Sequence, residues 1–201
     1  MPPSTRRRLS GSERRRAILD AAMEAFATRG YHGTTIDDIA SAAGVSKALI
    51  YEHFESKRAL HETLAGEQAA EIFARLAANA ASGSDGAERL RGGVDAFLGF
   101  VEERRDAWRA LFRDAADPEL GDVLDRAQAQ ATIALAEMMR SDPDAPAMTD
   151  RQVEMTAQLV SGAVQALANW WHDHPEAPRS ELVDRVMDVF WLGFERLRAR
   201  G

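Results

Sequence analysis

The 201-residue sequence has no cysteine, only two lysines, and no apolar run that approaches the ~20 residues of a membrane-spanning helix. Without cysteine, neither a disulfide framework nor a thiolate metal site can form. The arginine-rich start, MPPSTRRR, has no apolar stretch behind it, so we expect no signal peptide. We therefore expect a cytoplasmic protein that makes no use of a membrane.

The motifs of common enzyme classes are missing as well. The sequence has no glycine-rich phosphate loop and no motif that places Ser, His and an acidic residue together. Glu-x-x-His, the signature of di-iron bundles, does not occur. His172 and His174 are two residues apart, whereas two histidines on one helix face need a spacing of four. We predict no enzyme activity, no metal site and no cofactor.

The charge is unevenly distributed along the chain. The net charge is −7, but residues 1–60 hold ten Lys and Arg against seven Asp and Glu, a net charge of +3 that leaves −10 for residues 61–201. Both lysines, Lys47 and Lys57, lie in this basic part. Phosphate binding depends on nearby cations rather than on the total charge, so this distribution favours a nucleic-acid-binding module on an acidic body.

Residues 34–60 have the pattern of two short helices joined by a tight turn and followed by a third helix. Thr35 and Asp38 have the spacing of a capping box at the start of the first helix. Gly44 stands where that helix must end, in the position that favours a left-handed backbone. Ser46 can cap the second helix. Two helices joined by such a turn are typical of a helix-turn-helix, whose second helix enters the DNA major groove.

This stretch resembles the DNA-binding segment of the TetR family of transcriptional repressors, and with the preceding helix the match covers roughly residues 14–64. The matching residues are Thr34-Thr35, Ile39-Ala40, Ala43-Gly44-Val45-Ser46, Ile50-Tyr51, His53-Phe54, Ser56-Lys57 and Leu60. Ala48 stands where many members have glycine, and Ile50 where many have leucine. Ala48 leaves the base-reading surface unspecified.

The second helix is predicted to read bases from its N-terminal end. Ile50 and Phe54 can face the core, so Lys47 is free to donate to guanine, and Ala48 and Leu49 to contact a thymine methyl. The resemblance implies backbone contacts from Tyr51, His53, Lys57 and the two threonines. A core position for Tyr51 and a solvated Lys57 remain alternatives. The predicted DNA-binding residues are Thr34, Thr35, Ser46, Lys47, Ala48, Leu49, Tyr51, His53 and Lys57.

The remaining chain shows helical periodicity and no strand alternation, so we predict an all-α fold of about nine helices. Residues 1–11 are expected to form a flexible basic arm, either a disordered tail or an arm that contacts phosphates or the minor groove. Residues 12–55 form the predicted helix-turn-helix module, with Ser12 as its first cap. Residues 56–201 form an effector-binding and dimerisation domain that begins with a linking helix at 56–80.

The segment 155–171 contains no charged residue over 17 positions, about 25 Å of helix. A helix with one solvated face normally carries charge there, so this helix needs a second surface to bury. We predict a two-fold dimer in which the last two helices meet their copies, as the resemblance also implies. The predicted interface residues are Leu159, Ala163, Ala166, Val189, Phe190, Phe194 and Leu197.

Members of the family usually bind a small molecule in the domain after residue 80. Polar side chains on the charge-free helix are candidates to orient such a ligand in an apolar cavity. The alternative places these polar residues at the dimer seam or satisfied in the core. The predicted pocket residues are Phe97, Phe100, Trp108, Phe112, Met138, Met155, Gln158, Gln165, Asn169 and Trp170.

The sequence as a whole favours a homodimeric regulator that binds a palindromic operator on double-stranded DNA. The preferred interpretation is a repressor that an unidentified small-molecule effector releases from this operator. An activator of the same fold is one alternative. A helical ligand-binding protein without a role at DNA is the other, and Lys47, Tyr51 and Lys57 argue against it.

Overall fold

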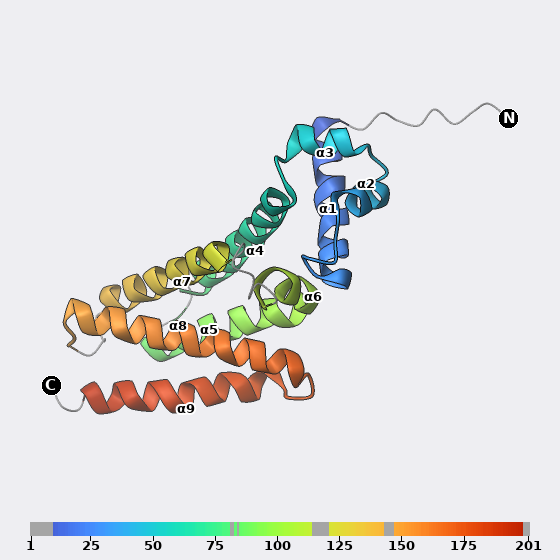
Figure 1. The fold of residues 1–201 in the computed structure, drawn as a ribbon. Helices are drawn as coiled ribbons and strands as arrows, with labels where there is room; N and C mark the ends of the chain where they lie inside the picture. Colours follow the sequence, from blue (N-terminus) through green and yellow to red (C-terminus); the bar gives the residue numbers. More distant parts are fainter. Residues whose placement is uncertain (1–9, 81–82, 84, 114–120, 143–146, 199–201) are drawn as a thin grey trace.

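The computed structural model describes residues 10–80, 83, 85–113, 121–142 and 147–198. Within these residues the chain is helical and has no strand, which confirms the predicted all-α fold (Figure 1). The helices are α1 Gly11–Arg29, α2 Ile36–Ala43, α3 Lys47–His53, α4 Lys57–Ala80, α5 Gly86–Glu103, α6 Arg105–Trp108, η1 Arg109–Arg113, α7 Gly121–Ser141, α8 Asp150–Asp173 and α9 Arg179–Arg198.

Helices α1 to α3 form a compact three-helix module at one end of the molecule (Figure 1). Helix α1 starts earlier than predicted: Ser10, not Ser12, is its N-cap, and a capping box with Glu13 fixes that position. Ser10 and Gly11 therefore belong to the helix and its cap. The rest of the predicted arm lies outside the described residues.

Helix α4 links this module to the body, and one hydrophobic core runs through both. Leu60 and Leu64 on α4 are buried in the same cluster as Phe26 of α1 and Leu111 of η1. Ser56 caps the start of α4, because its hydroxyl accepts from the backbone N–H of Ala59 at 3.0 Å. The module and the body are thus packed together through α4.

The body consists of helices α5 to α9 packed on α4 (Figure 1). Helix α7 packs along α8, and α5 packs against both α4 and α9. Helix α9 begins at Arg179, so Ser180 lies inside its first turn. Helix α7 begins at Gly121, and the residues directly before it lie outside the described part of the chain.

The stretch between α5 and α7 contains two different helical segments. Helix α6 covers Arg105–Trp108, and a π-helical turn, η1, covers Arg109–Arg113. Such turns interrupt the usual hydrogen-bond ladder and occur frequently at functional sites. Here the turn stacks the ring of Phe112 on that of Trp108, with centroids 5.0 Å apart, and places both against the interior of the body.

Candidate DNA-binding surface and effector cavity

Short-range hydrogen bonds fix the turn between α2 and α3. Thr35 caps α2 and forms a reciprocal capping box with Asp38. Gly44 ends α2 with φ 65° and ψ 32°, a left-handed conformation that glycine adopts without steric cost. Ser46 then caps α3 by accepting from the N–H of Leu49 at 3.2 Å. The three predicted caps and the predicted turn are confirmed.

Helix α3 buries one side and exposes the other. Ile50 is fully buried and Phe54, its C-cap, is 5% exposed, as predicted. Lys47, Ala48 and Tyr51 are exposed on the opposite side. These three predicted DNA-binding residues are therefore accessible on α3, and the predicted residues Leu49 and His53 are half-buried beside them.

Lys47, at the first turn of α3, forms an exposed ion pair. Its Nζ donates to Asp37 Oδ2 at 2.9 Å. That hydrogen bond, with the attraction of the same carboxylate, raises the pKa of Lys47. Exposed pairs of this kind contribute little to stability, so the ammonium can exchange Asp37 for a base or a phosphate.

The structure corrects the prediction for Thr34. Its side chain is 1% exposed, and its hydroxyl lies 2.8 Å from the carbonyl of Gly30 and 3.0 Å from that of Ala25. The side chain therefore fixes the end of α1 and cannot reach a phosphate. Thr35 is exposed, but its hydroxyl already donates to Asp38 Oδ2 at 2.6 Å.

Lys57 has an internal role that sequence patterns did not indicate. Its Nζ donates to the carbonyls of Tyr31 and Thr34 at 2.8 and 3.0 Å and lies 4.1 Å from the centroid of the Tyr31 ring. An ammonium has three N–H donors, and these contacts use two. Lys57 thus clamps the α1–α2 loop to the start of α4, and one of its three N–H donors is not used by these two carbonyls.

His61 is a second buried group that the sequence pattern did not distinguish. It is fully buried, its Nε2 lies 3.3 Å from the carbonyl oxygen of Ala110, and its ring packs edge-on against Phe26 and Tyr31. It joins α1, α4 and η1. Its position between Leu60 and Leu64 on the buried stripe of α4 is the sequence signal that indicates this role.

An apolar cavity of about 500 Å³ lies between α4, α5, α7 and α8. A smaller one of about 70 Å³ adjoins it and extends to η1. The two share Phe73, Leu76, Phe97 and Ala131 in their walls. Together they form an elongated space that runs from the far end of the body toward the helix-turn-helix module.

Five predicted pocket residues line this space, namely Phe97, Trp108, Phe112, Met138 and Gln165. Asn169 is adjacent, because its Oδ1 accepts from Trp108 Nε1 at 3.1 Å.

Four predicted pocket residues lie elsewhere. Phe100 is fully buried outside the cavity, under the guanidinium groups of Arg75 and Arg104. Gln158 is exposed and accepts from Thr132, and Met155 and Trp170 are 59% and 47% exposed. On α8, a residue faces the cavity because of its position around the helix, and not because its side chain is polar or apolar.

The outer face of α8 carries an exposed apolar stripe that α9 extends. Leu159 is 65% exposed, Ala163 and Ala166 are exposed, and Val189 on α9 is 59% exposed. Met155 and Trp170 complete the stripe at helical spacing. Phe190 is half-buried. The side chains of Phe194 and Leu197 lie outside the described residues.

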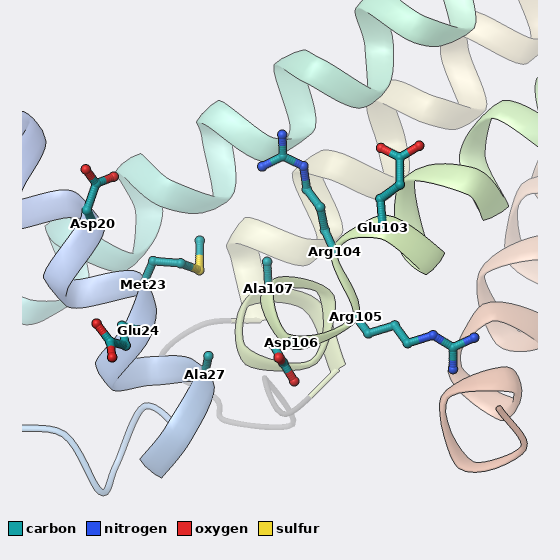
Figure 2. Close-up of a pocket in the computed structure, with 9 residues that line it drawn as sticks. All are labelled: Asp20, Met23, Glu24, Ala27, Glu103, Arg104, Arg105, Asp106 and Ala107. Carbon is teal, nitrogen blue, oxygen red and sulfur yellow. The ribbon is translucent and has the colours of Figure 1, made fainter.

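A separate hollow of about 350 Å³ opens between α1 and the α5–α6 corner. Figure 2 shows Met23 and Ala27 of α1 facing Ala107 of α6 across it, while Arg104 and Arg105 point away on opposite sides. Arg109 of η1 spans the same junction and donates to the carbonyl of Ala27. Helix α1 is therefore joined to the body both by the core that it shares with α4 and by this bond from η1.

This architecture, a helix-turn-helix module on a helical body with an internal apolar cavity, matches known families along most of the chain. A model described as bacterial regulatory proteins of the tetR family matches residues 18–64, and one described as the tetracyclin repressor-like C-terminal domain matches residues 87–193. The chain belongs to the TetR family and is a DNA-binding transcriptional regulator.

Relatives and solved structures agree with this assignment. The transcriptional activator FasR of Mycolicibacterium smegmatis is 28% identical over 192 residues, which cover 94% of this chain and 87% of FasR. The crystal structure of a TetR-like regulator from Rhodococcus sp. RHA1 has 27% identity and a TM-score of 0.74, with 92% and 98% of the chains covered. FadR of Bacillus subtilis, solved with stearoyl-CoA, shares the fold at 18% identity, with a TM-score of 0.72 and 88% and 97% coverage. None of the helices among the described residues could cross a membrane.

Proposed function

We propose that this regulator binds a palindromic operator as a homodimer and is released from it when a small, largely apolar effector enters the body. The observation that carries the proposal is a continuous line of contacts. The cavity reaches Trp108 at the end of α6 and Phe112 on η1, and Arg109, the first residue of η1, bonds to the last turn of α1. An effector that fills the cavity can therefore displace the element that holds the DNA-binding module.

The proposed DNA contacts come from the exposed side of α3. Lys47 reads bases from the first turn, with Ala48 and Leu49 beside it, and Ser46 presents the helix start. Tyr51 and His53 hold the DNA backbone, and Lys57 contributes its remaining donor. Thr35 contacts the backbone from the start of α2. One short helix makes few base contacts, so two copies at fixed spacing are needed for specific binding.

The apolar stripe on α8 and α9 supports a homodimer in which each stripe meets its copy. Burying exposed side chains as large as Leu159 and Trp170 in an interface stabilises the dimer by about 25 cal/mol per Å² of apolar surface removed from water. A two-fold arrangement brings the same stripe of both chains together and closes the assembly at two subunits. The dimer then sets the distance between the two α3 helices.

Effector release requires a ligand that binds the DNA-free conformation more tightly than the DNA-bound one. The lining of the cavity is apolar along most of its length, and FadR, which shares the fold, was solved with stearoyl-CoA. We propose that the effector carries a long apolar chain. We assign the chain no enzyme activity and place its action in the cytoplasm, where a bacterial operator lies.

A second candidate function is activation of transcription, which FasR's description as an activator favours. The DNA-binding surface, the dimer and the cavity serve an activator equally well. The two differ only in whether the bound protein blocks or recruits polymerase. A reporter under the selected operator distinguishes them, because deletion of the regulator raises expression for a repressor and lowers it for an activator.

The proposal is tested by selecting bound duplexes from a random DNA pool with the wild-type protein and with Lys47→Ala. We expect a palindromic site for the wild type and a loss of about 1–3 kcal/mol of discrimination at one base pair per half-site for the variant. Arg91→Ala, which removes one positive charge from the body, is the control and should select the wild-type site. Enrichment of no sequence by the wild-type protein would contradict the proposal.

A further inference from the structure

One end of the larger cavity is polar, in contrast to the rest of its wall. Arg89, near the start of α5, lines the cavity at this end beside Asn79 of α4. Its Nη2 lies 2.9 Å from an oxygen of Asp142, and its Nη1 donates to the carbonyl of Gly83 at 3.4 Å. The side chains of Arg89 and Asp142 are only 18% and 12% exposed. A mostly buried guanidinium thus terminates an otherwise apolar space.

Asp142 and Arg89 differ in their position relative to the cavity. Arg89 is part of the wall, whereas Asp142 lies behind it and does not line the space. Asp142 also approaches the N-terminal end of α5 closely, because a Cβ added to Gly86 would lie 2.4 Å from its Oδ2. A helix N-terminus stabilises a carboxylate. Asp142 therefore keeps a favourable environment if part of its contact with Arg89 is given up.

Glu137 is the acidic residue in the cavity wall at this end. Its side chain is 73% exposed and lies 3.8 Å from Arg140. Solvent and Arg140 screen its charge, whereas the charge of Arg89 is mostly desolvated and acts more strongly. The guanidinium, paired with Asp142 from behind, is therefore the mostly buried charged group that a molecule entering the cavity meets.

We propose that the cavity binds an amphiphile with one apolar chain and one anionic head group, and that Arg89 binds this head group in partial exchange for Asp142. The proposal rests on the proposed role of the cavity as the effector site and specifies the chemistry of the effector. Arginine forms strong, paired hydrogen bonds with carboxylates and phosphates, and these bonds strengthen where water is excluded. An uncharged chain of equal length gains nothing from Arg89.

The first experiment measures binding by titration calorimetry at pH 7 with decanoate, decanol and decanoyl-CoA. The three probes share the chain and differ in the head: an ionised carboxylate, a hydroxyl, and a neutral thioester that carries phosphates on its long arm. We expect decanoate to bind the wild type at least about tenfold more tightly than decanol, since one charge-assisted pair is typically worth that much. Longer carboxylates should bind about fourfold more tightly per added methylene until the cavity is full.

Two substitutions at the pair should then act in opposite directions. Arg89→Gln removes the charge and should reduce decanoate affinity to that of decanol, while Arg89→Lys keeps part of the preference. Asp142→Asn removes the competing anion and should increase decanoate affinity several-fold. None of the three variants should change the affinity for decanol. A purely structural role of the pair would weaken all probes in both variants, so opposite changes for decanoate alone support a head-group site.

The outcomes separate this inference from the proposed function. Equal affinities of decanoate and decanol for the wild type, or a decanoate affinity that Arg89→Gln leaves unchanged, would overturn the head-group role and leave the apolar effector cavity in place. Binding of no probe by a folded, DNA-binding protein would overturn both. A preference for decanoyl-CoA that Arg89→Gln abolishes supports the same site with the phosphates as the anion. A preference for decanoate identifies the free acid.

Discussion

The helix-turn-helix module and the body both have local helix caps, and the body adds side-chain bonds between helices far apart in the sequence. In the module, the bonds that define helix ends join residues three positions apart: Ser10 with Glu13, Thr35 with Asp38, and Ser46 with Leu49. In the body, Trp108 bonds to Asn169 and Gln128 to Ser161, across 61 and 33 positions.

This difference assigns different properties to the two regions. Local capping bonds set the helix ends of the module without help from the body, while Lys57 of α4 and the shared core fix how the module sits on the body. The body is defined by long-range packing that leaves an apolar cavity at its centre. A cavity forgoes contacts that a filled core would make, and a ligand can restore them. Local bonds therefore define the helix-turn-helix module, which reads DNA. The body, which we propose responds to the effector, contains the unfilled cavity.

The largest expected effect comes from a substitution in the body that changes the affinity for DNA. Ala163→Arg places a charge in the centre of the exposed stripe on α8 and should yield monomers in sedimentation analysis. Loss of the second DNA contact should weaken binding to the palindromic site by about 100-fold or more, because the linked binding of two heads is lost. Circular dichroism should show unchanged helix content.

Ala74→Arg is the matched control, because Ala74 is an equally exposed alanine within a long helix, α4. It should remain dimeric and bind the operator as the wild type does. A dimeric Ala163→Arg with wild-type affinity would show that subunits associate through another surface. The stripe on α8 would then need a different explanation.

The sequence was sufficient to predict the local features of the module. The caps Thr35 and Ser46, the left-handed Gly44 and the inward pair Ile50 and Phe54 follow from spacing alone, and the structure confirms them. The first cap was wrong by two positions, because Ser10 and not Ser12 begins α1. The inward direction of Thr34 and the clamp made by Lys57 did not follow. Both depend on where the α1–α2 loop lies relative to α4, and residues far apart in sequence determine that position.

Prediction of the cavity was limited for a related reason. Periodicity distinguishes an apolar face from a polar one, but α8 has apolar side chains nearly all round. Leu159 and Val160 are neighbours in sequence, yet one is on the outer stripe and the other lines the cavity. Arg89 was missed because a charged side chain on a helix is normally solvated, and only tertiary structure shows it buried beside Asp142.

Substitutions of the two lysines should have effects of intermediate size, and they compare a long-range bond with a local exposed ion pair. Lys57→Ala should lower the free energy of unfolding by about 1–3 kcal/mol, since two carbonyls lose a charged donor. Lys47→Ala removes an exposed ion pair and should change stability by less than about 0.5 kcal/mol. Urea unfolding followed by circular dichroism measures both.

The same pair of variants separates structure from DNA contact. Lys57→Ala should also reduce operator affinity at all sequences and flatten its dependence on salt, if the third donor reaches a phosphate. An unchanged salt slope together with lowered stability would limit Lys57 to its structural role. Unchanged stability would contradict the clamp.

The smallest expected effect is the pH dependence of the α2 capping box. Hydrogen bonds from the Thr35 hydroxyl, and then from its backbone N–H, hold the pKa of Asp38 below its ordinary value of 3.8. A lowered folded-state pKa means that ionised Asp38 stabilises the fold above pH 3.8 and that this contribution is lost as the pH falls through the folded value. Asp38→Asn should therefore flatten the acid limb of a plot of unfolding midpoint against pH. Thr35→Ala should flatten it by a smaller amount, because it removes the hydroxyl donor, the larger cause of the shift, and leaves the backbone N–H that also donates to Asp38. Combining the two changes should add nothing further if the box acts as one unit. Additive effects would mean that Asp38 acts through Arg29, 4.0 Å away, and not through the local cap.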